Sequence, residues 1–398
     1  MINYFYLIVC FLVVTVASSK VNAIELSGNV EVEWSAYQRD GQFPGQGYQS
    51  NLSLSIEPEW YWQWNGGSDR LVFIPFLRGD EHDAERSHGD IRELSWVHVG
   101  EKWEFRTGFR KVFWGVTEFN HLVDIINQTD SVDSFDGEEK LGQPMLNISR
   151  VTDWGIVDAF VLVGFRERTF AGAEGRLRGR LVADTDRANY ESTDEEKHID
   201  YALRWSHSVG VFDVGLYWFD GTDRNPILQT QADNGVTRLI PFYQQVTQVG
   251  VDLQATIDSW LWKLEAIQKD SRQDDYLASQ VGVEYTLYGL NSTATDVGIL
   301  VEYGWDERDY TADNTFQNDI FLGFRFTLND PKDSALLISA GYDADFYTKS
   351  LLVEASTRFN DYWTIALEGV FVESRNVADP AAVLVDDDRL QLTVKRYF

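Results

Sequence analysis

The chain has 398 residues, of which 63 are Asp or Glu and 34 are Lys or Arg, so its formal net charge is −29 at pH 7. This acidity argues against a nucleic-acid partner, because binding phosphates needs a positively charged face. The single cysteine excludes a disulfide scaffold. Yet 14% of the residues are aromatic, including 14 tryptophans, and so many rings in so acidic a chain need an apolar surrounding.

The first 23 residues are predicted to be a signal peptide. Phe5 to Ala17 is a nearly unbroken apolar run, and Val21-Asn22-Ala23 has the small residue of a cleavage site. The run is too short for a membrane helix, which needs about 20 apolar residues. Cys10 follows Val9, where a lipoprotein has a small residue, so we expect export without lipidation. The mature chain is then 24–398, with no cysteine to hold a metal.

Large apolar and polar residues alternate along the whole mature chain. A clear example is the set of apolar residues at every second position of 297–305: Val297, Ile299, Val301, Tyr303 and Trp305. Successive side chains of a strand point to opposite faces, so each such segment has one apolar and one polar face.

Eighteen strands are predicted from this alternation. They span residues 26–37, 48–64, 70–79, 90–99, 102–112, 144–152, 156–168, 197–208, 211–220, 240–257, 260–269, 275–289, 294–306, 316–328, 334–344, 348–359, 362–374 and 388–398. Short, turn-like links such as 100–101 and 258–259 alternate with links that are often long and acidic, such as 169–196. Short turns on one rim and long loops on the other are typical of an outer-membrane barrel. We therefore predict an all-β, transmembrane, antiparallel up-and-down barrel of sixteen to eighteen strands.

Two stretches resemble known families. The ending Arg389-Leu-Gln-Leu-Thr-Val-Lys-Arg-Tyr-Phe398 resembles the terminal strand of Gram-negative outer-membrane proteins, which implies that Phe398 is the signal read by the barrel-assembly machinery. The residues Arg106-x-Gly108, Trp114-Gly115-x-Thr117-Glu118 and Asp124-x-x-Asn127 are similar to a segment of uncharacterised porin-like barrels, known only as a domain of unknown function. That resemblance implies an outer-membrane location and small-molecule passage, with no catalytic residues.

The segment Phe113–Gln143 interrupts the alternation and is the longest link. With the amino terminus in the periplasm, it is the third outward loop. In general porins, which this arrangement resembles, the third loop folds back and narrows the pore. Four residues, Phe119, Leu122, Val123 and Ile126, have the spacing of one apolar stripe on a short helix. We expect this third loop to rest that stripe on the inner wall, as a constriction or a plug.

The charges of the constriction are predicted from strand phase. Arginines expected to face the lumen are Arg106, Arg110, Arg166, Arg204 and Arg325, and acids expected on the third loop include Glu118, Asp124 and Asp130. An arginine wall opposite an acidic loop would create a transverse field that sorts solutes by charge. Alternatively, these residues only pair to brace the loop, or a strand has the opposite phase.

Other chemistry has less support. His121 and Asp124 could be two metal ligands, but no third ligand is apparent. His198, Asp200 and Ser206 share a predicted lumen face, as a lumenal hydrolase would need. A basic cluster could grip lipopolysaccharide phosphates or be an ordinary solvated loop: Arg166, Arg168, Arg176, Arg178 and Arg180.

Aromatic residues also have predicted positions. Trp60, Trp62 and Trp64 precede one short turn, and Trp260 and Trp262 follow another, as an interfacial girdle requires. Tyr217 and Phe219 face the lumen on their predicted strand, where they either stack with sugars or pack against a loop.

The sequence therefore predicts a porin-like channel for passive or substrate-biased diffusion of small polar or anionic solutes, without catalysis or a cofactor. The expected partners are outer-membrane lipids, lipopolysaccharide, the barrel-assembly machinery and small polar solutes, and a homo-oligomer is left open. One alternative is a non-conducting scaffold or the outer partner of a lipid or polysaccharide export system. Another is the lumenal hydrolase.

Overall fold

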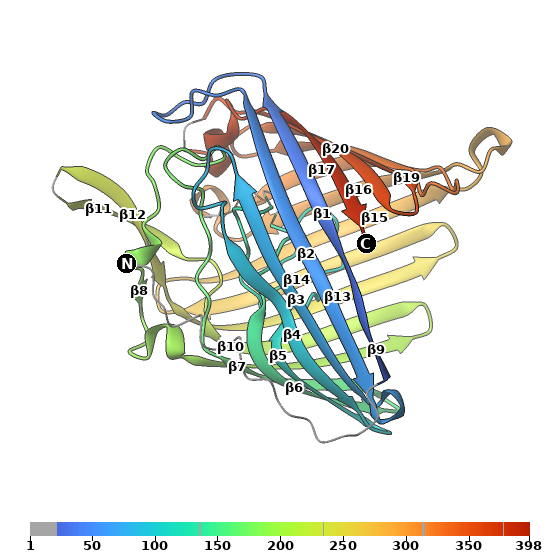
Figure 1. The fold of residues 1–398 in the computed structure, drawn as a ribbon. Helices are drawn as coiled ribbons and strands as arrows, with labels where there is room; N and C mark the ends of the chain where they lie inside the picture. Colours follow the sequence, from blue (N-terminus) through green and yellow to red (C-terminus); the bar gives the residue numbers. More distant parts are fainter. Residues whose placement is uncertain (1–21, 135–136, 234, 313, 315, 377) are drawn as a thin grey trace.

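A computed structural model describes residues 22–134, 137–233, 235–312, 314, 316–376 and 378–398. Eighteen strands form one sheet (Figure 1). They are β1 (Asn22–Tyr37), β2 (Ser50–Trp64), β3 (Asp69–Asp80), β4 (Gly89–Val99), β5 (Trp103–Arg110), β6 (Gln143–Thr152), β7 (Gly155–Val163), β9 (Ile199–Val209), β10 (Phe212–Thr222), β13 (Gln245–Ile257), β14 (Trp260–Ser271), β15 (Asp275–Leu287), β16 (Asp296–Asp306), β17 (Asn318–Thr327), β18 (Ala335–Asp343), β19 (Lys349–Asn360), β20 (Trp363–Glu373) and β21 (Arg389–Tyr397). The predicted signal peptide falls outside the described residues, except for Asn22 and Ala23 at the start of β1.

The sheet closes into a barrel. Each strand pairs antiparallel with the next, and β1 pairs with both β2 and β21, with Asn29 opposite Tyr397. Closure gives the strands hydrogen-bond partners on both sides, which is the condition for crossing lipid. The predicted all-β, up-and-down barrel of sixteen to eighteen strands is confirmed, and the number is eighteen.

One loop has more structure than predicted. Residues 221–239 were expected to be a link, but β11 (Ile227–Asp233) and β12 (Val236–Tyr243) form a hairpin there. The short strand β8 (Asn189–Tyr190) joins this hairpin, which projects from the barrel (Figure 1). The predicted strand 240–257 is therefore two strands, β12 and β13, which meet at Gln244. Alternation continues on both sides of Gln244, so the period alone does not reveal the break.

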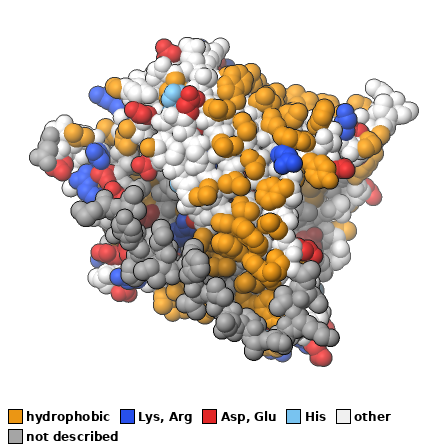
Figure 2. Space-filling view, viewed as in Figure 1, with side chains coloured by type: hydrophobic (Ala, Val, Ile, Leu, Met, Phe, Trp, Pro, Cys, Tyr) orange, Lys and Arg blue, Asp and Glu red, His pale blue; other side chains and the backbone are white. Residues whose placement is uncertain are grey.

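The barrel is apolar outside and polar inside. On β1, exposed Val32 and Trp34 alternate with buried Glu33 and Ser35. Hydrophobic side chains cover the face formed by β1, β2 and β3 (Figure 2). This is the reverse of a water-soluble domain and is the pattern of a strand with one face in lipid.

No helix among the described residues is long and apolar enough to cross a membrane.

The rim with the short turns carries aromatic side chains. Trp60 stacks with Phe73 at 5.5 Å, and Trp260 lies 6.0 Å from Trp262. The turn after β2 is tight because Asn65, Gly66 and Gly67 all have positive φ, at 52°, 66° and 97°. Further exposed rings near this rim are Trp103, Trp154, Tyr288, Phe359, Tyr362 and Phe398. Such a girdle is typical of a membrane–water interface.

Candidate pore constriction

The third loop, residues 111–142 in the structure, packs against the inner wall. Trp114, Val123, Ile125 and Ile126 are buried in one apolar cluster with side chains from β6, β7, β9, β10, β13, β14 and β15. The wall residues of this cluster are Met145, Phe160, Leu162, Ala202, Tyr217, Phe219, Val246, Ile267 and Ala278. Burial of these apolar groups favours a loop that stays inside the barrel, at roughly 25 cal/mol for each Å² removed from water.

The predicted helix around Phe119–Ile126 is wrong. Residues 118–126 form turns and bends, and the backbone N–H groups of Glu118, Phe119 and Val123 bond to wall carboxylates. Glu302 of β16 accepts from Glu118 N at 2.8 Å and from Phe119 N at 3.2 Å. The apolar spacing does match one face of a helix. However, backbone N–H groups that donate to wall carboxylates cannot also donate to the carbonyl groups of a helix.

Glu265 of β14 is the strongest anchor of the third loop, and strand phase alone did not single it out. Its side chain is fully buried and accepts hydrogen bonds from Val116 N at 2.7 Å, Thr117 N at 3.0 Å and Val123 N at 3.2 Å. It also accepts from Thr117 Oγ1 at 2.7 Å. The only sequence signal is an acid at a lumen-facing position, which is common in such barrels. The sequence does not show which acids meet the loop.

His121 adds an ionic contact between the third loop and the wall. Its Nε2 lies 2.9 Å from Glu138 and its Nδ1 lies 3.8 Å from Glu265. Burial alone would lower the pKa of His121, but the hydrogen bonds with Glu138 and Glu265 outweigh it and raise this pKa to about 10. His121 is therefore a cation at neutral pH, hydrogen-bonded to Glu138 and within ion-pair distance of Glu265, and does not form the metal-binding pair with Asp124 that its spacing suggested.

Three predicted arginines contact the third loop through their side chains, and two of them are Arg325 and Arg204. Arg325 of β17 bonds to Glu118, and Lys263 lies 3.5 Å from the same carboxylate. Arg204 of β9 pairs with Asp252 at 2.7 Å and lies over the Trp114 ring at 5.0 Å. Both contacts fit the bracing interpretation. Tyr217 likewise packs against Trp114, with ring centroids 4.9 Å apart, so it is a packing residue and not an open stacking surface.

Arg106 and Arg110 lie side by side on β5. Arg106 pairs with Glu104 at 2.7 Å and donates to Asn147 at 2.9 Å. Arg110 donates to Asn147 at 3.3 Å, and within the described part of the chain no carboxylate lies within ion-pair distance of it. Of the five predicted arginines, Arg110 therefore has the least compensated charge.

The other predicted charges have partners of their own. Arg166 follows the end of β7, pairs with Asp90 at 2.8 Å and donates to Gly142 O, in the third loop, at 3.0 Å. Asp124 accepts from Trp114 N at 2.6 Å and from Gly115 N at 3.1 Å, so it organises its own loop. Burial raises the pKa of Asp124. These two residues do not face each other across the lumen.

Asp130 belongs to a buried charge cluster that the sequence did not predict. Arg92 of β4 donates to Asp130 at 2.6 Å and also bonds to Asp133, which Arg78 contacts at 2.9 Å. Burial acts to raise the pKa of Asp130, but the hydrogen bond to His88 and the charge of Arg92 outweigh it and hold this pKa well below its usual range. These contacts hold the third loop against β3 and β4.

Three side chains of this cluster have the residue types and the spacing of metal ligands. Ligand atoms of His88, Asp130 and Asp133 lie within 4.8 Å of one another. However, Arg92 already contacts both carboxylates, and Arg78 contacts that of Asp133. Two guanidinium cations supply the positive charge that a metal would bring, so these residues do not fit a metal site.

The predicted hydrolase residues do not form a catalytic group. His198 Nδ1 lies 2.8 Å from Asp200, but Asp200 also pairs with Arg224 at 2.8 Å. Ser206 lies on the same strand as Asp200, six positions further on, which is roughly 20 Å at the rise of a strand.

Arg176, in the loop of residues 164–198, holds the outer rim together. It is 4% exposed and donates to Asp387 at 2.5 Å, to Asp386 O at 2.7 Å and to Tyr48 O at 2.8 Å. Its guanidinium also lies 4.1 Å from the centroid of the Tyr37 ring. Arg176 is therefore neither solvated nor free to bind lipopolysaccharide, as the basic-cluster interpretations required.

Arg176→Ala is expected to release the loop of residues 164–198 from its neighbours. The change leaves the buried Asp387 without its cation, which is strongly destabilising locally. We expect proteinase K to cut this loop in the folded barrel at least about tenfold faster, the equivalent of about 1.4 kcal/mol in local opening. Arg180→Ala is the matched control in the same loop, and equal cleavage rates for the two variants would contradict this role.

Comparison with known proteins identifies no family. No family model matches the chain, and no curated protein matches it. Among solved structures, it is similar to a loop-deletion mutant of OmpT, an outer membrane protein of Vibrio cholerae, with 10% identity, a TM-score of 0.48, and 94% of this chain and 99% of that chain covered. It is also similar to Pseudomonas putida OprB, with 9% identity, a TM-score of 0.47 and 94% of both chains covered. A mutant of the Rh. blastica porin gives 10% identity, a TM-score of 0.46, and 94% and 100% coverage.

Proposed function

We propose that the chain is an outer-membrane, porin-type channel for passive diffusion of small polar solutes, anions included, and that the third loop is its constriction. The observation that carries this proposal is a polar lumen inside an apolar exterior. The third loop narrows this lumen, and cavities remain beside the loop. Barrels of this strand number are wide enough for an aqueous path unless loops fill them.

The proposed location and partners follow from the same surfaces. The apolar exterior and aromatic rim suit outer-membrane lipid, and the outer loops would meet lipopolysaccharide. Phe398 directly follows β21 and donates its N–H to Gly28 O of β1 at 3.0 Å. This position beside the barrel seam supports its proposed role as the assembly signal. We propose no catalytic role and no cofactor.

The charge preference is proposed to come from Arg106 and Arg110. A double variant, Arg106→Gln with Arg110→Gln, should shift the reversal potential in a salt gradient toward cation selectivity, with the anion-to-cation permeability ratio falling at least about twofold. Single-channel recording in a planar bilayer measures this ratio. Arg150→Gln is the control, because Arg150 is exposed and lies over the Trp103 ring at 4.8 Å, at the short-turn rim. An unchanged anion-to-cation permeability ratio in the double variant would contradict the proposal that Arg106 and Arg110 favour anions.

A second candidate is a non-conducting barrel that serves as a scaffold or as the outer partner of an export system. The buried cluster under the third loop and the Arg176 contacts at the rim favour it, because both close space that a pore would use. A folded, heat-modifiable barrel that gives no conductance steps would contradict the channel and support this candidate.

A further inference from the structure

The third loop covers only part of the inner wall. Its contacts run from Arg78 and Arg92 on β3 and β4, through the apolar cluster and Glu265, to Glu302 and Arg325 on β16 and β17. The remaining wall, from β18 through β21 to β1, lines the two cavities described next. Water and solutes therefore have space on one side of the third loop.

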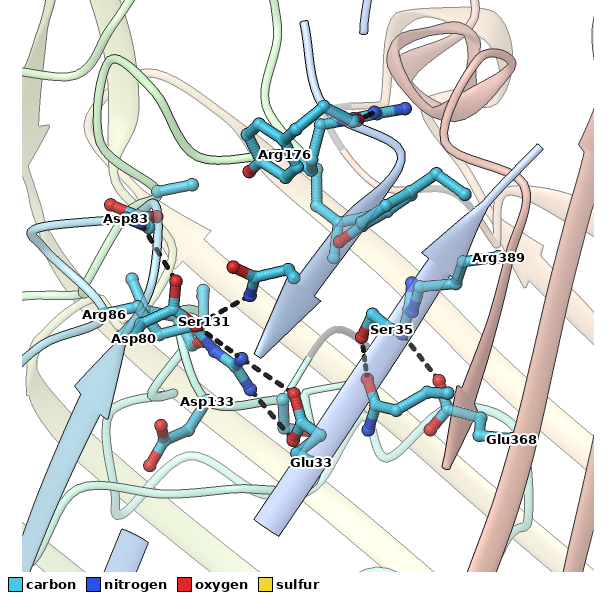
Figure 3. A pocket seen from close by; sticks show the side chains of 18 residues that line it. Glu33, Ser35, Asp80, Asp83, Arg86, Ser131, Asp133, Arg176, Glu368 and Arg389 are labelled. Atoms are coloured by element: carbon cyan, nitrogen blue, oxygen red, sulfur yellow. Dashed lines mark hydrogen bonds and ion pairs between the residues drawn. The ribbon is translucent and has the colours of Figure 1, made fainter. Parts of the chain in front are cut away.

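Two cavities lie along this remaining wall. The first, about 110 Å³, lies between β1, β2, β20, β21 and the outer loops, and its lining includes Ser35, Asn51 and Arg389 (Figure 3). The second, about 360 Å³, lies between Glu118 of the third loop and strands β17 to β21, and its lining includes Arg325 and Glu354. Glu368 and Gln391 line both cavities, so the cavities meet there.

The residues that connect the cavities form one row of direct strand partners. The row is Arg325, Leu337, Glu354, Glu368, Gln391, Ser35 and Asn51, each opposite the next on the neighbouring strand. Direct partners in a sheet point to the same face, and all seven residues line one or both cavities. The cavities are thus two parts of a single groove on the lumen side of the sheet.

This row also climbs from one rim of the barrel to the other. Arg325 is close to the end of β17 that leads into the short link 328–334, whereas Asn51 is close to the start of β2, just after the outer loop of residues 38–49. The climb is a consequence of strand tilt and stagger, because a line drawn across tilted strands rises around the barrel. A groove along the row can therefore carry a solute across the membrane.

The part of this groove where the two cavities meet carries an ion pair. Arg389 donates to Glu368 at 2.5 Å where the two cavities meet, and Ser35 donates to Gln391 at 3.2 Å beside them (Figure 3). Arg389 is 4% exposed at its side chain and Glu368 is 28% exposed, so the carboxylate is the group that faces the groove more openly. A solute that passes here must exchange hydrogen bonds with a carboxylate, a guanidinium and an amide.

We propose that solutes cross this protein along the row from Arg325 to Asn51 and that the Glu368–Arg389 pair is a selectivity filter on that route. The inference rests on the proposed channel function and adds the route and a second group of residues that select. It places this filter on β20 and β21, away from the arginines of β5, in addition to the charge preference proposed for Arg106 and Arg110.

The route is tested by thiol blocking. With Cys10 replaced by serine, Gln391→Cys and Ser206→Cys each carry one thiol; Gln391 lies at the junction, and Ser206 lies on β9, away from both cavities. A sulfonated methanethiosulfonate reagent should reduce single-channel conductance of Gln391→Cys at least about twofold and leave Ser206→Cys nearly unchanged, because only at Gln391 does the added bulk lie where the two cavities meet. If Gln391→Cys fails to fold, as judged by heat-modified gel mobility, Thr393→Cys in the second cavity replaces it.

The filter is tested by charge. Arg389→Gln should shift the reversal potential toward cations, and Glu368→Gln should shift it toward anions, because each removes one charge at the junction. Block of Ser206→Cys without block of Gln391→Cys, or no shift in either charge variant, would overturn the route while the channel function stands. A chain without variants that never conducts would instead overturn the channel function itself, and with it the route.

Discussion

Glu265→Ala is expected to release the third loop from the barrel wall. The variant removes the acceptor of four hydrogen bonds and leaves three buried backbone N–H groups unsatisfied, together with one partner of the cationic His121. Leaving buried donors and a buried charge without partners costs about 3–5 kcal/mol. We expect conductance steps that are larger and noisier than those of the unchanged chain, and a lower urea midpoint for unfolding of the barrel.

The matched control is Glu104→Ala. Glu104 also lies on the lumen side, but it contacts Arg106 and Arg70 on the wall and, within the described part of the chain, no residue of the third loop. Its removal should leave the noise of the open channel unchanged. If both variants give the same noise as the unchanged chain, the other contacts of the third loop hold it without Glu265, and Glu265 is not an anchor.

Arg92→Met is expected to destabilise the barrel by about 3–5 kcal/mol at neutral pH, because it leaves Asp130 and Asp133 buried with too little positive charge. The pH dependence should change sign. In the unchanged chain, the lowered pKa of Asp130 means that its contribution to stability is present above the usual aspartate range and is lost as the pH falls through the lowered pKa. In Arg92→Met, uncompensated burial should raise that pKa, so acidification from pH 7 to about 5 should increase stability.

Urea midpoints, followed by tryptophan fluorescence at several pH values, give this dependence. The triple variant Arg92→Met, Asp130→Asn and Asp133→Asn should recover most of the lost stability, since it removes the charges together. If the stability of Arg92→Met does not rise between pH 7 and about 5, Arg78 and His88 compensate the carboxylates without Arg92.

Local alternation in the sequence predicts the direction of side chains on a strand, but it does not predict where a strand breaks. Alternation on β1 or β5 is a property of neighbouring residues, so it correctly predicted a barrel of sixteen to eighteen strands and the inward direction of Arg106, Arg204 and Arg325. A break at Gln244 could not be read in this way, because residues on both sides alternate alike. The apolar spacing of Phe119–Ile126 predicted burial against the wall and also a helix, and only the helix was wrong.

The sequence by itself determined the barrel, because a period of two needs no knowledge of distant residues. Only the tertiary structure decided which charges meet. Glu118 and Arg325 are 207 residues apart, and Thr117 and Glu265 are 148 residues apart. A lumen-facing acid looks the same in sequence whether it bonds the third loop, as Glu265 does, or faces a groove, as Glu368 does. The closure of the barrel and the stagger of its strands place each of them.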